Sequence, residues 1–344
     1  MLKQQGFIYI IALIVMTITI MISLYLIYIF ELDYLILTYN NNNTQSYYLS
    51  EGKIYMCLYK DEYYINQLYP IILDEFRKES IKPLSRKVIL NKKDLENGDT
   101  YNKISIDFVD RDMRKNFQIV AESKWKEIYT KVTSYGTLVN HFFEMKLPIL
   151  GEHFLIEESL HDFNELLDNI IKNIDINNCG RSLRIFGLET IDYETIVLNK
   201  VDKKNYQIQC FRNDLLVPRI ENFSNNEVFI VIKNQINKPI NLIIGSQDAV
   251  EDKIDMNGII YVEGDIIISS AFNFNGILIV NNGIITVESK EKPNMKGIIL
   301  LKDCLDHDVL ENKIDILYDS KIIYKYGTYL PGFIEPKIDV IKIF

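Results

Sequence analysis

Residues Phe7–Phe30 read FIYIIALIVMTITIMISLYLIYIF, and their apolar character determines the structure of the N-terminal part of the chain. It contains no charged side chain, while Lys3 precedes it and Glu31 follows it. At ~1.5 Å per residue it forms a helix of roughly 36 Å, enough to cross a hydrocarbon core of about 30 Å. Because lipid offers the backbone no hydrogen-bond partners, we expect residues 7–30 to be a transmembrane helix.

The charges that flank this stretch predict its orientation. Lys3 lies on one side, and the acidic Glu31 and Asp33 lie on the other. This asymmetry places the N-terminus inside and the rest of the chain outside, as a single-pass protein of the cytoplasmic membrane. A cleaved secretory signal is not indicated, because such a signal has a shorter apolar core followed by a small-residue cleavage site.

The residues before the apolar stretch resemble the leader of type IV prepilins. Lys3-Gln-Gln-Gly6 leads directly into Phe7 and the apolar helix. In that family a prepilin peptidase cleaves after the glycine, and the new N-terminal residue is methylated. The resemblance therefore implies a leader of residues 1–6, cleavage between Gly6 and Phe7, and N-methylation of Phe7. A plain, uncleaved signal anchor is the alternative.

The helix is expected to continue outside the membrane. Apolar and tyrosine side chains recur at near-helical spacing from Leu32 to Tyr59, and residues 45–54 resemble the corresponding segment of PilX-type minor pilins and tip pseudopilins. We expect an exterior half of the helix at residues 31–78, kinked or ended at Pro70 and weakened by the asparagines at 40–43. The resemblance also implies that the N-terminal helix packs against other pilin subunits in a filament core, with contacts from Ile11, Leu13, Ile14 and Ile18.

One departure from the pilin pattern concerns the fifth residue of the mature chain. Major pilins carry Glu there, whose carboxylate compensates the terminal ammonium of a neighbouring subunit. Here the position is Ile11, and no acid occurs from Phe7 to Phe30. In the family this absence is typical of the subunit at the filament tip, so the resemblance implies a minor, initiating or tip-located subunit.

The net charge and the cysteine spacing disfavour two classes of function, nucleic-acid binding and zinc or redox chemistry. The net charge of −9 has the wrong sign for a generic nucleic-acid binder, so no nucleic-acid partner is predicted. The four cysteines, Cys57, Cys179, Cys210 and Cys304, form no CxxC pair, which disfavours a zinc or redox motif. Disulfides and buried free thiols both remain open, the latter above all for Cys57 in the expected helix.

Residues 79–178 are expected to form a pilin-like head with an inserted helix. Residues 81–101 read as a connecting loop, and alternating patterns at 103–111, 116–120 and 126–133 predict a strand meander with a turn at 110–115. This meander resembles the strands that follow the helix in PilX-type heads. Apolar residues between Glu152 and Ile174 recur at amphipathic helical spacing and predict the inserted helix.

Residues 179–344 are expected to be a β-rich domain with an internal repeat. The pattern Gly-apolar-apolar recurs at Gly258, Gly276 and Gly297, at spacings of 18 and 21 residues. Repeats of this period indicate the stacked parallel coils of a β-solenoid, with Asn-Gly pairs at its corners. The segment resembles the β-helical C-terminal region of some PilX-like pilins. An antiparallel sandwich is the alternative.

Candidate catalytic or metal-binding groups are sparse. His141 with Glu144, His153 with His161, and the cluster from Asp303 to Asp308 match no catalytic or metal motif, so neither a metal nor a cofactor is predicted. The alternative function is a membrane-anchored, extracellular β-helix enzyme acting on carbohydrate. It would need paired acids on adjacent coils, for which Glu263 and Asp265 are the nearest candidates.

Together these patterns predict an α+β protein with a transmembrane pilin-type helix, a small α/β head and a C-terminal all-β region. The expected function is structural and not enzymatic: a minor subunit of a type IV pilus or related filament. The expected partners are the prepilin peptidase, the pilus assembly platform, other pilin subunits and the cytoplasmic membrane. A cell-adhesion surface on the head is compatible with this function.

Overall fold

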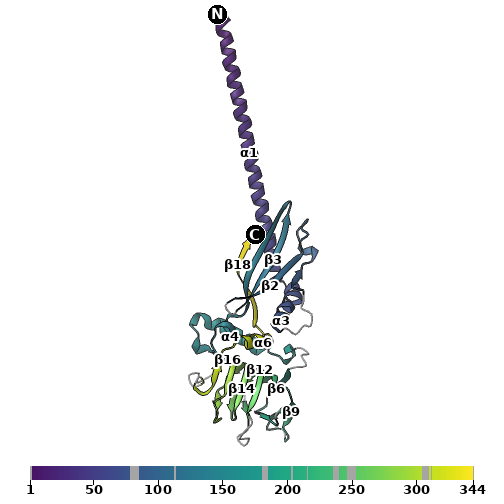
Figure 1. Ribbon diagram of the computed structural model, residues 1–344, viewed down its shortest axis with the longest axis vertical. Helices are drawn as coiled ribbons and strands as arrows, with labels where there is room; N and C mark the ends of the chain where they lie inside the picture. The colour runs from purple at the N-terminus through teal and green to yellow at the C-terminus, as the bar shows by residue number, and fades with distance from the viewer. Residues whose placement is uncertain are drawn as a thin grey trace.

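A single long helix carries a mostly β body in the computed structural model (Figure 1). The structure describes residues 2–77, 85–111, 114–179, 185–202, 204–214, 216–234, 240–245, 253–303, 310 and 312–343. Helix α1 spans Leu2–Tyr59 and leaves the body at one end, with the N-terminus far from the β sheets. An N-terminal apolar helix followed by several sheets agrees with the predicted α+β class.

The exterior half of the helix is interrupted at Lys60 and not at Pro70. Residues 40–43 remain helical, so the asparagines there do not break the helix. Lys60 adopts an extended conformation (φ −91°, ψ 117°), and its carbonyl accepts from Tyr63 N at 2.8 Å to start the next turn. Helices α2 (Asp61–Tyr63), η1 (Tyr64–Leu68, a π-helix) and α3 (Tyr69–Arg77) follow. Pro70 is the second residue of α3, which continues directly from η1, so the helix does not end there.

The second half of α1 packs on a five-stranded antiparallel sheet, here called the hairpin sheet. Its order is β1 (Lys87–Ile89), β2 (Lys103–Arg111), β3 (Arg114–Trp125), β4 (Ile128–Val139) and β18 (Ile334–Ile343). The predicted meander is confirmed, and alternate β3 residues such as Phe117 and Ile119 are buried. The predicted loop at 81–101 is partly wrong, because it contains β1 and the 3-10 helix η2 (Lys92–Asp94).

Two further sheets are built from strands that alternate along the chain. The inner sheet has the order β17 (Asp315–Leu317), β16 (Asn294–Lys302), β14 (Phe272–Asn281), β12 (Ile254–Glu263), β10 (Glu227–Lys233) and β6 (Phe186–Ile191). The outer sheet has the order β15 (Ile285–Val287), β13 (Asp265–Ile268), β11 (Asn241–Ile244), β7 (Thr195–Lys200), β8 (Tyr206–Phe211) and β9 (Arg219–Phe223).

The glycine repeat sets the register of the inner sheet. Gly258, Gly276 and Gly297 pair directly across β12, β14 and β16, and these strands run parallel. A Cβ on Gly276 would lie 1.9 Å from the carbonyl oxygen of Gly258, so the backbones approach too closely for a side chain. Because these strands are parallel, the antiparallel sandwich is wrong for this segment. The glycines lie within continuous strands, which corrects their expected place at turn corners.

The inner sheet is buried on both faces, as is usual for parallel strands. One face packs against the outer sheet through residues such as Val228, Ile230 and Ile260. The other face packs against α4 (Glu157–Asn173), which confirms the inserted helix, and α6 (Ser320–Gly327). In Figure 1 these two helices lie between the hairpin sheet and the inner sheet.

Two strands cross the expected domain boundary at 178/179. The short β5 (Ile149–Gly151), from the expected head, pairs with β16 of the inner sheet. Strand β18, from the expected C-terminal domain, pairs antiparallel with β4 of the hairpin sheet. The short 3-10 helices η3 (His141–Glu144), η4 (Glu152–Phe154) and η5 (Ile176–Cys179) connect these parts. Contacts between the two parts are therefore made by strand pairing as well as by side chains.

Candidate functional site

The first half of α1 is an uncovered apolar surface. It belongs to the single helix in the described part of the chain that is long and apolar enough to cross a membrane, with a mean hydropathy of 2.7 over an 18-residue window. Every residue from Phe7 to Tyr28 is exposed, and Tyr9 exposes 77% of its surface. So much uncovered apolar area in one place requires a lipid or protein partner.

The hydroxyl groups within this stretch are compatible with an apolar environment. Thr17 Oγ1 donates to the carbonyl of Ile14 at 2.8 Å, and Thr19 Oγ1 donates to that of Val15 at 2.8 Å. Ser23 Oγ donates to the carbonyl of Thr19 at 2.9 Å. Because each hydroxyl is satisfied by its own helix, none of the three needs water as a partner.

The uncovered surface extends well past the predicted membrane span. Leu32, Tyr34, Leu35, Ile36, Leu37 and Tyr39 are all exposed, and the first buried residue of α1 is Ser46. From Phe7 to Gln45 the helix is roughly 58 Å long, against a hydrocarbon core of about 30 Å. A bilayer would therefore cover only about half of this surface.

The residues predicted to be processed or to form a filament core lie on this part of α1. Gly6 is helical, although its surroundings lie outside the described side chains. Phe7 is 66% exposed. The core-forming candidates are also open, with exposed fractions of 45% for Ile11, 66% for Leu13, 50% for Ile14 and 50% for Ile18. Cleavage, methylation and filament packing remain predictions.

A polar row on α1 attaches the helix to the hairpin sheet. Ser46 Oγ donates to the Ser123 carbonyl at 3.3 Å, and Ser50 Oγ donates to the Thr130 carbonyl at 3.2 Å. One turn further, Lys53 Nζ donates to Asp99 Oδ2 at 2.6 Å. The Lys53 side chain also donates to two main-chain carbonyls, those of Tyr101 (2.6 Å) and Glu122 (2.7 Å).

The Lys53–Asp99 pair is fully buried, with 3% and 1% of the side chains exposed. Burial lowers the pKa of the Lys53 ammonium, and the Asp99 carboxylate opposes that shift. Three acceptors satisfy the three N–H groups of the ammonium. Removing either partner would leave a charge without compensation, so this pair fixes how α1 sits on the hairpin sheet.

The cysteines for which the structure gives side chains are free. Cys57 and Cys210 are both buried and unpaired. Burial raises the pKa of the Cys57 thiol to about 12 and that of Cys210 to about 11, so both are unreactive at neutral pH. The side chains of Cys179 and Cys304 lie outside the described residues.

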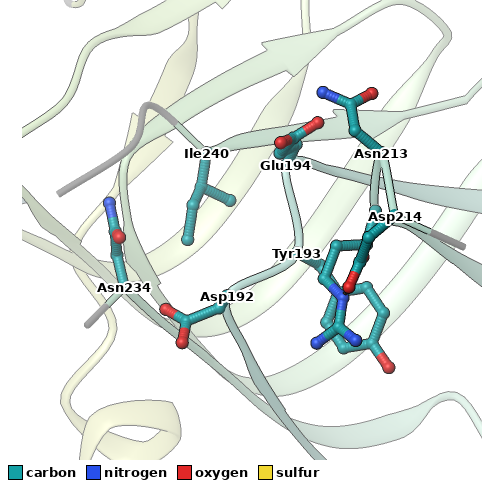
Figure 2. Close-up of a pocket in the computed structure, with 8 residues that line it drawn as sticks. Asp192, Tyr193, Glu194, Asn213, Asp214, Asn234 and Ile240 are labelled. Carbon is teal, nitrogen blue, oxygen red and sulfur yellow. Dashed lines mark hydrogen bonds and ion pairs between the residues drawn. The ribbon is translucent and has the colours of Figure 1, made fainter. Parts of the chain in front are cut away.

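A pocket of about 450 Å³ lies beside the start of the connection between β8 and β9. Three connections that are far apart in sequence form it (Figure 2): the β6–β7 turn, the segment after β8 and the ends of the β10–β11 connection. Its lining consists of Asp192, Tyr193, Glu194, Arg212, Asn213, Asp214, Asn234 and Ile240. This mixture of carboxylates, amides and one aromatic ring suits a small polar ligand.

Sequence reasoning did not find this pocket. Asp192 has a φ of 61° and lies in the tight turn between β6 and β7. Arg212 Nε is 2.6 Å from Asp214 Oδ1, and its guanidinium lies 5.7 Å from the centre of the Tyr193 ring. These contacts depend on the way strands from two sheets end together, which no single segment reveals.

The other candidate groups have structural surroundings. Glu263 accepts from the Tyr261 hydroxyl (2.5 Å) and from Asn234 N (2.6 Å), while Asp265 Oδ1 accepts from Ile284 N (2.9 Å). Both carboxylates thus hold chain connections in place. His153 lies in η4 and His161 in α4, so their expected place on one helix is wrong.

The remaining candidates include His141 and the described part of the cluster that begins at Asp303. Within the described ranges, no group of three His, Cys, Asp or Glu side chains is placed to hold a metal. Of the cluster from Asp303 to Asp308, the residues after Asp303 lie outside these ranges. The His141 ring lies next to the Phe142 ring, with a centroid distance of 3.9 Å and an interplanar angle of 37°.

Comparison of the chain with protein-family models, curated proteins and solved structures gives no match.

Proposed function

We propose that this protein is a minor subunit of a type IV pilus or a related filament, anchored in the cytoplasmic membrane before assembly. The observation that carries the proposal is the length of uncovered apolar helix, which runs from Phe7 to Tyr39 and exceeds what a bilayer covers. A simple anchor needs only the first half of this surface. Packing of α1 against sister helices in a filament accounts for both halves.

The leader and the missing acid assign a position within such a filament. Prepilin peptidase cleaves between Gly6 and Phe7, and methylation of Phe7 follows. The mature chain then carries Ile11 where a bulk pilin carries a glutamate. A subunit without this carboxylate does not compensate the terminal ammonium of a neighbour, which suits an initiating or tip-located subunit loaded at the assembly platform.

The orientation and the β body complete the proposal. Lys3 stays inside, and the body is displayed outside. The in-register parallel strands, which alternate between the inner and outer sheets, support a β-solenoid interpretation of the C-terminal region. The pocket between its connections offers a place for adhesive contact with a polar ligand.

Cleavage at Gly6 is tested by replacing Gly6 with Leu in the native host. We expect the variant to retain Met1 in membrane fractions and to be absent from sheared filaments, while the natural chain begins at a methylated Phe7. Gly52→Ala is a matched control, since Gly52 lies on the same helix and a Cβ there meets no atom within 4 Å. Normal filament incorporation of the Gly6→Leu chain would contradict the proposal, and so would a natural chain that retains Met1.

A further inference from the structure

The hairpin formed by β8 and β9 exposes a group of apolar side chains. Phe211 is 37% exposed, Leu216 104%, Val217 72% and Ile220 47%. Gln209 pairs with Ile220, which places Phe211 and Ile220 on the same, outward face of the outer sheet as diagonal neighbours. Leu216 and Val217 lie in the connection between the two strands. We call Leu216 and Val217 the apolar tip, whereas Phe211 and Ile220 lie further back, on the strands themselves.

The position of the apolar tip excludes contact with the membrane that holds α1. Strand β9 lies at the end of the body opposite the N-terminus (Figure 1). The tip is convex, because Leu216 is as open as a side chain in an extended chain. A protruding aliphatic group of this kind fits a soft apolar medium better than a flat protein surface.

Two arginines lie where the strands end, immediately behind the tip. Arg212 follows β8, and Arg219 begins β9. Arg212 pairs with Asp214 at 2.6 Å and Arg219 with Glu221 at 3.0 Å. All four of these side chains are more than one third exposed, so these pairs are weak and can exchange for another anion.

Tyr193 adds an aromatic group to the same layer. Its ring lies beneath the Arg212 guanidinium, and Figure 2 places Tyr193 beside Asp214. The order from the outermost point inward is therefore aliphatic, then cationic and aromatic. This order matches the acyl boundary and the headgroup layer of a phospholipid bilayer, where Arg and Tyr prefer the interface.

We propose that the apolar tip inserts into the surface of a phospholipid membrane other than the one that anchors α1. Leu216 and Val217 enter the acyl boundary, while Arg212 and Arg219 reach the lipid phosphates. The biological setting rests on the proposed external display of the body, but the contact itself needs neither cleavage at Gly6 nor a filament.

The test uses the full chain with α1 held in lipid nanodiscs, mixed with separate vesicles of phosphatidylcholine and phosphatidylglycerol and then floated on a density gradient. We expect the protein to float with the vesicles, whereas empty nanodiscs do not. In the Leu216→Asp/Val217→Asp variant, vesicle affinity should fall by about tenfold or more. Arg212→Gln/Arg219→Gln should weaken binding most on vesicles rich in phosphatidylglycerol.

Val201→Asp is the matched control, since Val201 is 56% exposed on another connection, and it should float as the natural chain does. Both sites are exposed, so neither substitution should alter thermal unfolding. The proposal is overturned if the natural chain does not float, which is the result expected of a tip that docks on a protein. It is also overturned if Val201→Asp loses vesicle binding as much as Leu216→Asp/Val217→Asp does. A filament defect of the Gly6→Leu chain would leave this result unchanged, so the two proposals fail separately.

Discussion

The single residue Lys53 shows how helix α1 is fixed to the body. Its ammonium lies among Asp99 and two carbonyls with almost no contact to water. The sequence places this lysine on the face of α1 that also carries Ile54 and Cys57, which are fully buried. A lysine in a buried helix face was a signal for a buried partner, but the partner lies 46 residues away and could not be identified from the sequence.

Replacing Lys53 with Met should destabilise the body strongly. The change leaves the Asp99 carboxylate buried without a cation, for which the expected loss is about 3–5 kcal/mol. The double variant Lys53→Met/Asp99→Asn should recover much of this loss, and urea unfolding of the full chain in detergent micelles measures both. Lys60→Met is the control: Lys60 also forms a 2.6 Å pair, with Asp94, but its side chain is 39% exposed, so this substitution should destabilise the body much less. Equal losses at Lys53 and Lys60 would refute the argument.

Glu144 predicts a pH dependence of stability. Burial raises the pKa of its carboxyl above the usual 4.5, although the Tyr324 hydroxyl and Arg114 act in the opposite direction. Because the folded state holds the proton more tightly, the contribution to stability is present below about pH 4.5 and is lost as the pH rises through the folded value.

Glu144→Gln removes this titration while keeping an acceptor for Tyr324, whose hydroxyl lies 2.7 Å from Glu144 Oε1. Relative to the natural chain, we expect the variant to gain stability between about pH 4 and pH 7. Thermal unfolding across this range measures the difference. A constant difference between the two proteins at all pH values would show that Glu144 does not titrate in this way.

For individual helices and strands, local periodicity in the sequence predicted many of the elements but few of their long-range pairings. The spacing of Phe163, Leu167 and Ile170 identified α4 because one face of a helix repeats every three to four residues. The break at Lys60 was missed, since Lys60 is not a residue type that usually ends a helix, although its backbone is extended in the structure. The glycine repeat identified similar strands in the sequence, and in the structure the repeated glycines pair with one another and set the register.

Gly276→Ala should disrupt the inner sheet. The new Cβ would lie 1.9 Å from the Gly258 carbonyl oxygen, a backbone atom that cannot move aside without parting the strands. We expect a loss of about 1–3 kcal/mol or more, which is typical of an overpacked core. Hydrogen exchange of β12 and β14 should rise in parallel. Gly52→Ala serves as control, and a Gly276→Ala chain as stable as this control would contradict the observed register.

At the scale of the whole molecule, the two parts of the body complete each other's sheets. Strand β5 joins the inner sheet and β18 joins the hairpin sheet. The expected domain boundary at 178/179 did not include these strand pairings, because the residue pattern of a strand does not identify the strand with which it pairs. The pocket near β9 was missed for the same reason, as its lining comes from connections that meet only after both sheets have formed.

Removing residues 334–344 should therefore damage a sheet built almost 200 residues earlier in the chain. Residues 132–139 of β4 would lose their pairing with β18, which leaves an open edge prone to aggregation. We expect faster hydrogen exchange in β3 and β4 and a lower unfolding temperature. Ile343→Ser, at a position that is 60% exposed, should leave both unchanged. Normal protection of β4 in the shortened chain would show that β18 is dispensable.

The return of β18 also determines how the protein would carry tension. A pull between α1 and the β9 end runs along the long axis in Figure 1, and the strands of the hairpin sheet run in nearly the same direction. The hydrogen bonds between β4 and β18 lie across that direction. A stretching force would therefore shear many of these hydrogen bonds together instead of opening them one after another. The pairing of β4 with β18 should therefore resist mechanical load well.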